Sequence, residues 1–213
     1  MWPFNKRHNV IVIGADSMLG HDLVEFLRKK SMQKDSRIGN VLPLMHKDYD
    51  ITWLENKASS HDKLASILRN SENDYIDYDI VVNCAAYTDT YKIESEYDAR
   101  LTSYAVNAIG PKNLAILCKC YNKKLIHIST DYVFSDYLLS KESIVYKDTL
   151  QRIRLGTATP SGSLAIFAFG TYAAPFPVNI YGTHKLIGEK LVRDYLPKKS
   201  AIIRTSWLYG HHK

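Results

Sequence analysis

The chain has 213 residues, 46% of them hydrophobic and 23% charged, which is ordinary for a globular protein and suits one α/β domain. No apolar run approaches the roughly 20 residues that cross a bilayer, and the first residues lack the apolar core of a signal peptide. We therefore expect a cytoplasmic protein without a membrane partner. Most of the net charge of +6 comes from residues 184–213, where basic and apolar residues alternate as on a solvated helix face. We therefore do not expect nucleic-acid binding.

Short, continuous, β-branched runs alternate with amphipathic segments along the chain. Such runs are typical of strands buried on both faces of a parallel sheet. The alternation predicts an α/β fold with a doubly wound parallel sheet of the Rossmann type, in one NAD(P)-binding domain covering 1–213. In its first helix, Phe26 is among the residues expected to face the core. We expect strands at 9–13, 41–45, 79–83, 125–129 and 201–204, and helices at 19–30, 61–70, 97–121 and from about Tyr181.

The stretch 136–175 is the exception, because neither strand nor helix periodicity is sustained in it. It begins polar and becomes small and apolar, and an irregular stretch of this length is uncommon inside a compact domain. A lid, an interaction arm and a local β-hairpin all fit this pattern. We interpret 136–175 as an atypical insertion, and we expect it to join the chain into a homo-oligomer or a larger assembly.

The cysteines do not indicate a disulfide or a metal site. Cys118 and Cys120 lie two residues apart on a predicted helix, where their side chains point in different directions. No cluster of Cys or His has the spacing of metal ligands. We therefore predict that these two thiols and that of Cys84 are free and buried, and that no metal is bound.

The turn at 14–20 lies directly between a buried strand and a helix, where dinucleotide-binding proteins hold a pyrophosphate. A glycine at each end permits the tight turn and close helix packing, while the first N–H groups of the helix face the phosphates. Ser17 stands where dinucleotide-binding turns of this kind usually have a central glycine, so its hydroxyl either donates to a phosphate or crowds the backbone. The residues expected to hold the cofactor here are Gly14, Asp16, Ser17, Met18, Leu19 and Gly20.

The residues after the second predicted strand distinguish NAD from NADP in dinucleotide enzymes. An acid there binds the free 2′-hydroxyl of the ribose, whereas a basic group accommodates a 2′-phosphate. Here His46 and Lys47 come first, and the first acid is Asp48. This order favours NADP, with NAD as the alternative. It is also compatible with His46 and Lys47 being solvated loop residues without a role in binding.

Tyr181 and Lys185 lie four residues apart at the start of the last predicted helix and therefore share a face. An ammonium group near a phenol stabilises the phenolate and lowers the tyrosine pKa, which makes the tyrosine an acid or base near neutrality. The spacing alone is common on surface helices. The Tyr181–Lys185 pair is significant because it follows, along the chain, the glycine-rich turn and Thr130 at a strand end.

Five ordered blocks of sequence carry a more specific likeness. They are NCAAYT at 83–88, AVNA at 105–108, HISTDYVF at 127–134, PVNIYG with KLIGE at 177–189, and RTSWLYG at 204–210. With these blocks the chain resembles the dTDP-4-dehydrorhamnose reductase family, which are extended short-chain dehydrogenases of dTDP-rhamnose biosynthesis. The resemblance implies an oxidoreductase that uses NADPH or NADH to reduce the C4 ketone of a dTDP-linked 4-dehydro-6-deoxy sugar.

The resemblance also implies roles for single residues. Tyr181 would protonate the developing alkoxide, and Lys185 would lower the tyrosine pKa and hold the nicotinamide ribose. Thr130 would orient the ketone, and Asn107 would support Lys185 through water. Further cofactor contacts are implied for Cys84, Ala85, Ala86 and Tyr87, and sugar contacts for Thr88, Asp131, Tyr132, Val133, Phe134 and Trp207.

Three departures from the family pattern affect what we expect of the substrate domain and of the function. Tyr91 stands where relatives usually carry an aspartate, the insertion 136–175 borders the site, and relatives continue past the position of Lys213 with residues that build the nucleotide-sugar pocket. We therefore expect a missing or minimal substrate domain. The alternative function is a catalytically idle relative that serves as a regulatory or structural binding subunit.

Overall fold

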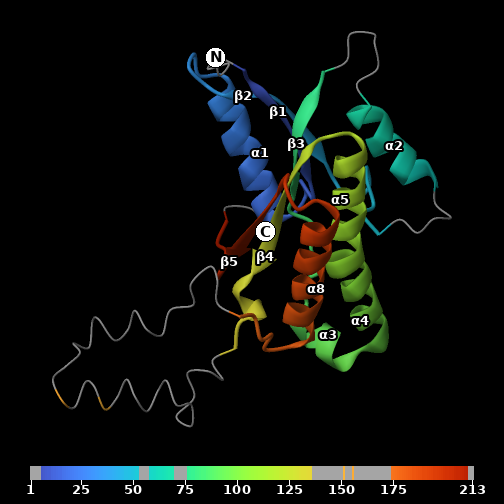
Figure 1. Ribbon diagram of the computed structural model, residues 1–213, viewed down its shortest axis with the longest axis vertical. Coiled ribbons are helices and arrows are strands. Elements are labelled where there is room, and N and C mark those ends of the chain that lie inside the picture. Colours follow the sequence, from blue (N-terminus) through green and yellow to red (C-terminus); the bar gives the residue numbers. More distant parts are fainter. Residues whose placement is uncertain are drawn as a thin grey trace.

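Five strands form one sheet in the computed structural model, which describes residues 6–52, 58–69, 76–135, 151, 155 and 174–210 (Figure 1). They are β1 (His8–Ile13), β2 (Ile38–Leu44), β3 (Tyr78–Asn83), β4 (Lys124–Thr130) and β5 (Ser200–Thr205). Their order is β2-β1-β3-β4-β5, and every neighbouring pair is parallel. The order therefore reverses between β1 and β3, the place where open α/β sheets bind ligands beyond the carboxyl ends of their strands.

Helices cover both faces of this sheet (Figure 1). One face holds α1 (Met18–Ser31), and the other holds α2 (Ala58–Leu68), α5 (Gly110–Cys120) and α8 (Ile180–Tyr195). This arrangement confirms the predicted α/β fold with a doubly wound parallel sheet of the Rossmann type. The connecting elements are α3 (Thr90–Ser95), α4 (Tyr97–Tyr104), a π-helical turn (Ala105–Ile109) and a 3-10 turn (Asp131–Val133).

The first strand shows how one apolar run fills two cores. Ile11 and Ile13 are at most 1% exposed and belong to the core under α2, α5 and α8. Val10 and Val12 are at most 3% exposed and belong to the core under α1. Neighbouring side chains of a strand point to opposite faces, and each buried side chain of this size contributes about 1.5–3 kcal/mol. Burial on both faces thus explains the unbroken run of β-branched residues.

The boundaries and faces of some elements differ from the predictions. Four strands begin one residue earlier than predicted, and β2 begins at Ile38 instead of Val41. Because β2 lies at the edge of the sheet, its first residues, such as the exposed Asn40, need no apolar side chain. The prediction that Phe26 faces the core is wrong, because its side chain is 55% exposed. The apolar stripe that α1 packs inward is narrower and consists of Leu19, Leu23, Val24 and Leu27.

The helix predicted over 97–121 is present from Tyr97 to Cys120, with a π-helical turn inside it between α4 and α5 that was not predicted. Pro111 has no backbone N–H, so it cannot donate to the carbonyl oxygen of Asn107 and continue the helical ladder. That carbonyl faces α8 instead. A Cβ built on Gly188 would lie 2.2 Å from it. The π-helical turn before the proline thus lies where α8 approaches closely through Gly188.

The three cysteines are free, as predicted. Cys84 and Cys118 are buried, and burial raises the pKa of both thiols to about 12. The prediction of a buried thiol is wrong for Cys120, which is exposed at the end of α5.

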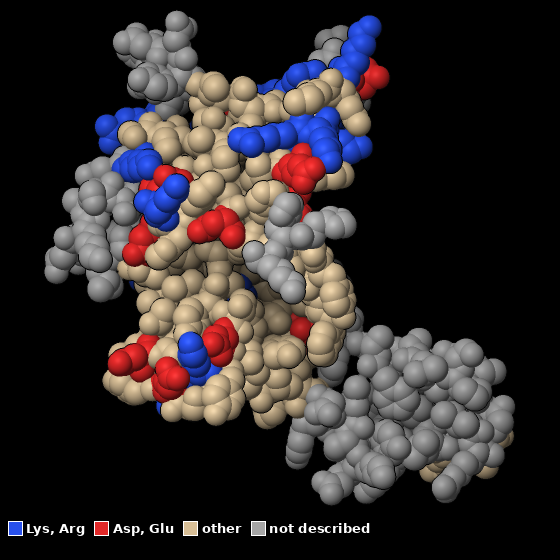
Figure 2. Space-filling view, turned by 180° about the vertical axis from the view of Figure 1, so that it is seen from behind, with Lys and Arg blue, Asp and Glu red and all other residues tan. Residues whose placement is uncertain are grey.

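On the face shown in Figure 2, basic and acidic side chains of the described residues lie side by side rather than as one basic field. Oppositely charged side chains on the surface pair in places, for example Lys6 with Asp79 at 2.8 Å and Lys29 with Glu25. Within the described ranges, none of the helices is long and apolar enough to cross a membrane.

An ion pair between a buried glutamate and a partly exposed arginine joins α8 to β5. The side chain of Glu189 is fully buried and accepts hydrogen bonds from Arg204 Nε at 2.9 Å and Nη2 at 2.6 Å. The hydrogen bond with Glu189 raises the pKa of Arg204, so the guanidinium keeps its charge. Arg204 also lies over the Phe134 ring, 4.8 Å from its centroid. The pair thus fixes α8 against the strand beside β4.

Glu189→Gln keeps the shape of the side chain but leaves Arg204 without its counterion. We expect the free energy of unfolding to fall by about 3 kcal/mol, as when one partner of a buried pair is removed. Glu25→Gln is the matched control, because Glu25 pairs with Lys29 on the exposed side of α1, and it should cost less than about 0.5 kcal/mol. Urea unfolding measures both variants, and equal losses would contradict the argument from burial.

Candidate active site

The turn after β1 brings the ends of three strands together. The amides of Gly14 and Ala15 both donate to the carbonyl oxygen of Leu44 at the end of β2, at 2.9 and 3.1 Å. Gly14 has φ +75°, in the left-handed region, and a Cβ built on it would lie 2.6 Å from the backbone nitrogen of Ala85. Any larger residue would therefore be strained and would also clash with the segment after β3.

Ser17 is the N-cap of α1, and its hydroxyl is used inside the turn. Its Oγ donates to the carbonyl oxygen of Gly14 at 2.7 Å and accepts from the amide of Gly20 at 3.1 Å. The single hydroxyl proton is used in the bond to Gly14, so in the structure it is not donated to a phosphate. The side chain caps the helix and does not crowd the backbone, as the alternative role required. The amides of Met18 and Leu19 have no hydrogen-bond partner in the described part of the chain. They remain open to an anion at the positive end of the helix.

Two cavities lie beyond the carboxyl ends of the strands. The first, which we call the Tyr181 cavity, has a volume of about 420 Å³, and the second, the His46 cavity, has about 460 Å³. Ser17 and Ala86 line both of them. The glycine-rich turn and the segment after β3 therefore lie between the two cavities, so an elongated ligand that crosses the turn can enter both.

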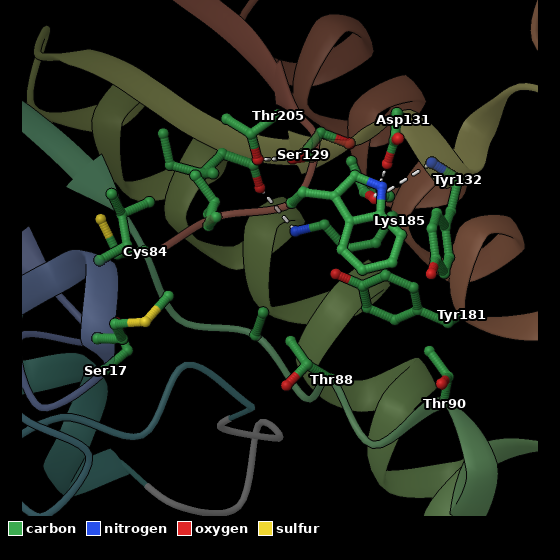
Figure 3. A pocket seen from close by; sticks show the side chains of 17 residues that line it. Ser17, Cys84, Thr88, Thr90, Ser129, Asp131, Tyr132, Tyr181, Lys185 and Thr205 are labelled. Atoms are coloured by element: carbon green, nitrogen blue, oxygen red, sulfur yellow. Dashed lines mark hydrogen bonds between the residues drawn. The ribbon is translucent and has the colours of Figure 1, made fainter. Parts of the chain in front are cut away.

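Helix α8 presents Tyr181 and Lys185 to the end of β4 (Figure 3). The hydroxyl of Tyr181 points into the cavity. The ring of Tyr132 stands edge-on to the Tyr181 ring, with 6.0 Å between the ring centroids. Lys185 is only 2% exposed, and its Nζ donates to the carbonyl oxygen of Ile128 at 2.6 Å. The two groups therefore share one cavity, as their spacing predicts.

Thr130 ends β4 at the same cavity. Its Oγ1 donates to Asp131 Oδ1 at 3.2 Å and accepts from the amide of Tyr132 at 3.2 Å. Both contacts lie within the 3-10 turn that follows the strand. This local turn holds the threonine hydroxyl at the strand end.

Burial dominates the acid–base properties of the site. Burial raises the pKa of Tyr181 to about 12, Asp131 and Tyr132 add to the rise, and a hydrogen bond with Thr130 lowers it. Burial also lowers the pKa of Lys185 to about 8, although Glu189 raises it. The pKa of Tyr181 thus shifts in the direction opposite to the prediction, because the phenol is buried and the ammonium of Lys185 is turned toward a carbonyl group.

Asn107 holds the segment after β3 through direct hydrogen bonds. Its Oδ1 accepts from the amide of Tyr87 at 3.1 Å, and its Nδ2 donates to the carbonyl oxygen of Tyr87 at 2.8 Å and to Ser103 Oγ at 3.0 Å. The support of Lys185 by Asn107 through water stays a prediction, and the ammonium itself donates to the carbonyl oxygen of Ile128.

Most of the predicted site residues line one of the two cavities. The Tyr181 cavity is lined by the predicted residues Ser17, Met18, Leu19, Cys84, Ala86, Thr88, Thr130, Asp131, Tyr132, Tyr181, Lys185 and Trp207. The His46 cavity is lined by the predicted residues Gly14, Asp16, Ser17, His46, Ala85, Ala86 and Tyr87.

Five predicted residues lie away from both cavities. Gly20 and Asn107 support the turn and the segment after β3 from behind. Lys47 is exposed on the loop that follows β2. Val133 is fully buried and Phe134 packs under a guanidinium group, because successive residues of a tight turn cannot all face one cavity.

The predicted insertion 136–175 lies outside the described residues except for 151, 155, 174 and 175. The homo-oligomer or larger assembly expected through it stays a prediction.

Several lining residues were not predicted. Ser129 and Thr205 line the Tyr181 cavity, and Tyr49, Asp50 and Ile51 line the His46 cavity. The side chain of Ser129 is buried, and its Oγ has no hydrogen-bond partner among the described residues. The parallel register of β4 and β5 would have indicated Ser129 and Thr205, because both lie where these strands end. Nothing in the sequence marked 49–51.

Comparison with known proteins extends over almost the whole chain. The family described as RmlD substrate binding domain matches residues 8–213. A dTDP-4-dehydrorhamnose reductase of Mycobacterium tuberculosis is 37% identical over 204 residues, which cover 96% of this chain and 51% of that protein. One of Mycolicibacterium smegmatis is 32% identical over 200 residues, which cover 94% of this chain and 46% of that protein. The chain spans about half the length of these relatives.

Solved structures agree with the sequence comparison. The crystal structure of a dTDP-4-dehydrorhamnose reductase from Bacillus anthracis in complex with NADP aligns with a TM-score of 0.68 at 29% identity. The alignment covers 98% of this chain and 57% of that one.

Ser17→Ala removes both hydrogen bonds of the cap at the start of α1. We expect it to lower the free energy of unfolding by about 1 kcal/mol, whereas Ser17→Gly should cost only a few tenths, about 0.3 kcal/mol. Thermal or urea unfolding of the two variants checks this order. An alanine variant as stable as the unaltered chain would mean that the hydroxyl does not brace the turn.

The buried ammonium of Lys185 gives a prediction for the pH dependence of stability. With its pKa lowered to about 8, the unfolded chain binds the lysine proton more strongly, so stability rises with pH above about 8 and levels off above the ordinary lysine pKa of about 10.4. Lys185→Met should therefore stabilise the fold near pH 7, by on the order of 3 kcal/mol, and lose this advantage by about pH 10.5.

Lys190→Met is the matched control, because Lys190 is exposed on the same helix. Urea unfolding of both variants and the unaltered chain at several pH values measures the difference. A pH-independent gain for Lys185→Met, equal to that for Lys190→Met, would contradict the assignment.

Proposed function

The chain belongs to the RmlD substrate binding domain family, and from this premise we propose that it reduces the 4-keto group of a dTDP-linked 4-dehydro-6-deoxy sugar with NADPH. The observation that carries the proposal is the single cavity that Tyr181, Lys185 and Thr130 share beside the glycine-rich turn. The named activity of the two relatives and the NADP in the Bacillus anthracis structure support the choice of substrate and cofactor.

Tyr181 is the proton donor in this proposal. Reduction of a ketone creates an oxyanion that takes up a proton in or after the transition state. Because the pKa of Tyr181 is raised to about 12, the phenol carries its proton at neutral pH and can donate it. Lys185, with its pKa lowered to about 8, can return a proton to the site near neutrality. Thr130 orients the ketone when its hydroxyl proton, which bonds Asp131 Oδ1 in the structure, turns to the substrate oxygen.

The strand ends fit a dinucleotide cofactor. The amides of Met18 and Leu19, which have no partner among the described residues, suit a pyrophosphate. Because a Cβ on Gly14 would clash with Ala85, glycine is required there, and no side chain covers the backbone at this point. The buried Oγ of Ser129, which has no partner among the described residues, offers a hydrogen bond to a ligand in the Tyr181 cavity. His46 at the second cavity favours a 2′-phosphate, hence NADPH over NADH. The bound cofactor supplies the hydride.

The sugar occupies the remaining part of the Tyr181 cavity, which Thr88, Asp131 and Tyr132 line. Trp207 stands at its rim with 77% of its surface exposed and with φ +46°. A bulky residue in the left-handed region is unusual and marks a strained backbone, which is often found at binding sites. Contact with the sugar nucleotide accounts for an indole held in this position.

Tyr181→Phe tests the proton donor. It should lower the rate of NADPH oxidation with dTDP-4-dehydrorhamnose by about 10²- to 10⁴-fold, the usual share of a general acid. The affinity for NADPH should stay nearly unchanged, since only one hydroxyl is lost. Tyr195→Phe at the far end of α8 is the matched control and should keep full activity. Turnover that survives in Tyr181→Phe would contradict the assignment.

The unaltered chain distinguishes reductase from idle relative. NADPH titration followed by the same assay should give binding and oxidation. Binding without oxidation would contradict reduction by this chain and favour a catalytically idle cofactor-binding subunit. Tighter binding of NADH than of NADPH would contradict the choice of NADPH and the role given to His46, but not the reduction itself.

A further inference from the structure

A chain of buried hydrogen bonds connects α8 to the segment after β3. His184, the residue before Lys185, places its Nδ1 2.9 Å from Ser103 Oγ on α4. Ser103 lies 3.0 Å from Asn107 Nδ2 in the π-helical turn, and Asn107 holds both the amide and the carbonyl group of Tyr87. Ser103 and Asn107 are fully buried, and His184 is 8% exposed. The chain thus runs from the helix of Tyr181 to the lining of the His46 cavity.

The protons along this chain can be assigned. Asn107 Nδ2 has two protons, and they go to the carbonyl oxygen of Tyr87 and to Ser103 Oγ. Ser103 therefore accepts from Asn107, and its single proton is left for His184 Nδ1. That nitrogen accepts it in the neutral form of His184 that carries its proton on Nε2. A proton on Nδ1 would reverse this bond, so that the Ser103 proton must turn away and Nδ1 competes with Asn107 Nδ2 for the lone pairs of Ser103 Oγ.

The charged groups around His184 oppose its protonation on balance. Arg100 on α4 is held in place, with Nε donating to the carbonyl oxygen of Ile93 at 3.2 Å and Nη2 to that of Glu94 at 2.8 Å. Burial lowers the pKa of His184, Arg100 lowers it further, and the carboxylate of Glu94 on α3 raises it. The ring of Tyr104 packs edge-on against the imidazole at 5.4 Å.

We propose that neutral His184 is a positioning residue that fixes the Tyr87 backbone at the edge of the cofactor cleft through Ser103 and Asn107, and that its protonation loosens this backbone. The proposal rests on the proposed function only in taking the His46 cavity as part of a cofactor cleft. Tyr87 lines that cavity, and both polar groups of its backbone depend on Asn107. Acid therefore weakens cofactor binding through a residue that does not line either cavity.

The first measurement needs no cofactor. Protection of the Tyr87 amide from hydrogen exchange, relative to its intrinsic rate, reports its bond to Asn107. In the unaltered chain this protection should fall as the pH falls through the titration of His184, followed by the NMR shifts of its imidazole. In His184→Asn, whose carbonyl oxygen can still accept from Ser103 but does not titrate, the protection should stay constant over that range.

Ser103→Ala removes the connecting hydroxyl. It should lower Tyr87 protection roughly two- to tenfold at every pH, the range that one lost hydrogen bond supports. His184→Phe fills a similar space without an acceptor and should behave in the same way. His8→Asn, at the opposite end of the sheet, is the matched control and should keep the pH dependence of the unaltered chain.

The second measurement is NADPH affinity against pH. It should fall in parallel with Tyr87 protection in the unaltered chain, and this acid-dependent part should be absent in His184→Asn. Because His46 is present in both proteins, the difference between them belongs to His184. Ser103→Ala should bind NADPH about two- to tenfold more weakly at every pH.

The two measurements separate the proposals. If His184→Asn loses Tyr87 protection in acid as the unaltered chain does, or if Ser103→Ala leaves the protection unchanged, the positioning role is overturned. If the protection behaves as expected but NADPH does not bind at any pH, the positioning of Tyr87 is supported and the proposed function is overturned instead.

Discussion

The buried ammonium of Lys185 is the interaction on which the active-site end of the molecule depends. Taking a lysine out of water is unfavourable, and the single hydrogen bond to the Ile128 carbonyl offsets this only in part, as the lowered pKa shows. The carboxylate of Glu189, one turn further along α8, favours the charged form from within the protein. The helix must therefore be held firmly enough to keep an unfavourable group in place.

That firmness comes from contacts on several sides of α8. Glu189 ties the helix to β5 through Arg204, and Gly188 lets it approach the π-helical turn closely. His184 ties it to α4 through Ser103. Because each contact leaves the helix in a different direction, the side of α8 that faces β4 is left with little freedom. Functional groups on a rigid element supported by surrounding contacts keep their geometry better than groups on loops.

The sequence predicted the sheet and the helix of Tyr181 and Lys185 because periodicity and spacing follow from local geometry. It failed where a side chain's role depends on distant neighbours. A π-helical turn just before Pro111 lies inside a helix whose apolar period continues through it, and Phe26 lies just outside a stripe that only packing defines. The direction of the Tyr181 pKa shift depends on burial, which no short motif encodes.

Ser17 shows another limit of prediction from motifs, because a residue that departs from the motif fits the geometry of the turn. A serine in place of the central glycine of a dinucleotide turn suggests crowding or a phosphate contact. In the structure its hydroxyl proton bonds the Gly14 carbonyl, and the open amides belong to Met18 and Leu19. Anions at a helix start are bound through backbone groups. What the turn requires at 17 is a residue that caps the helix without blocking those amides, and serine meets that requirement.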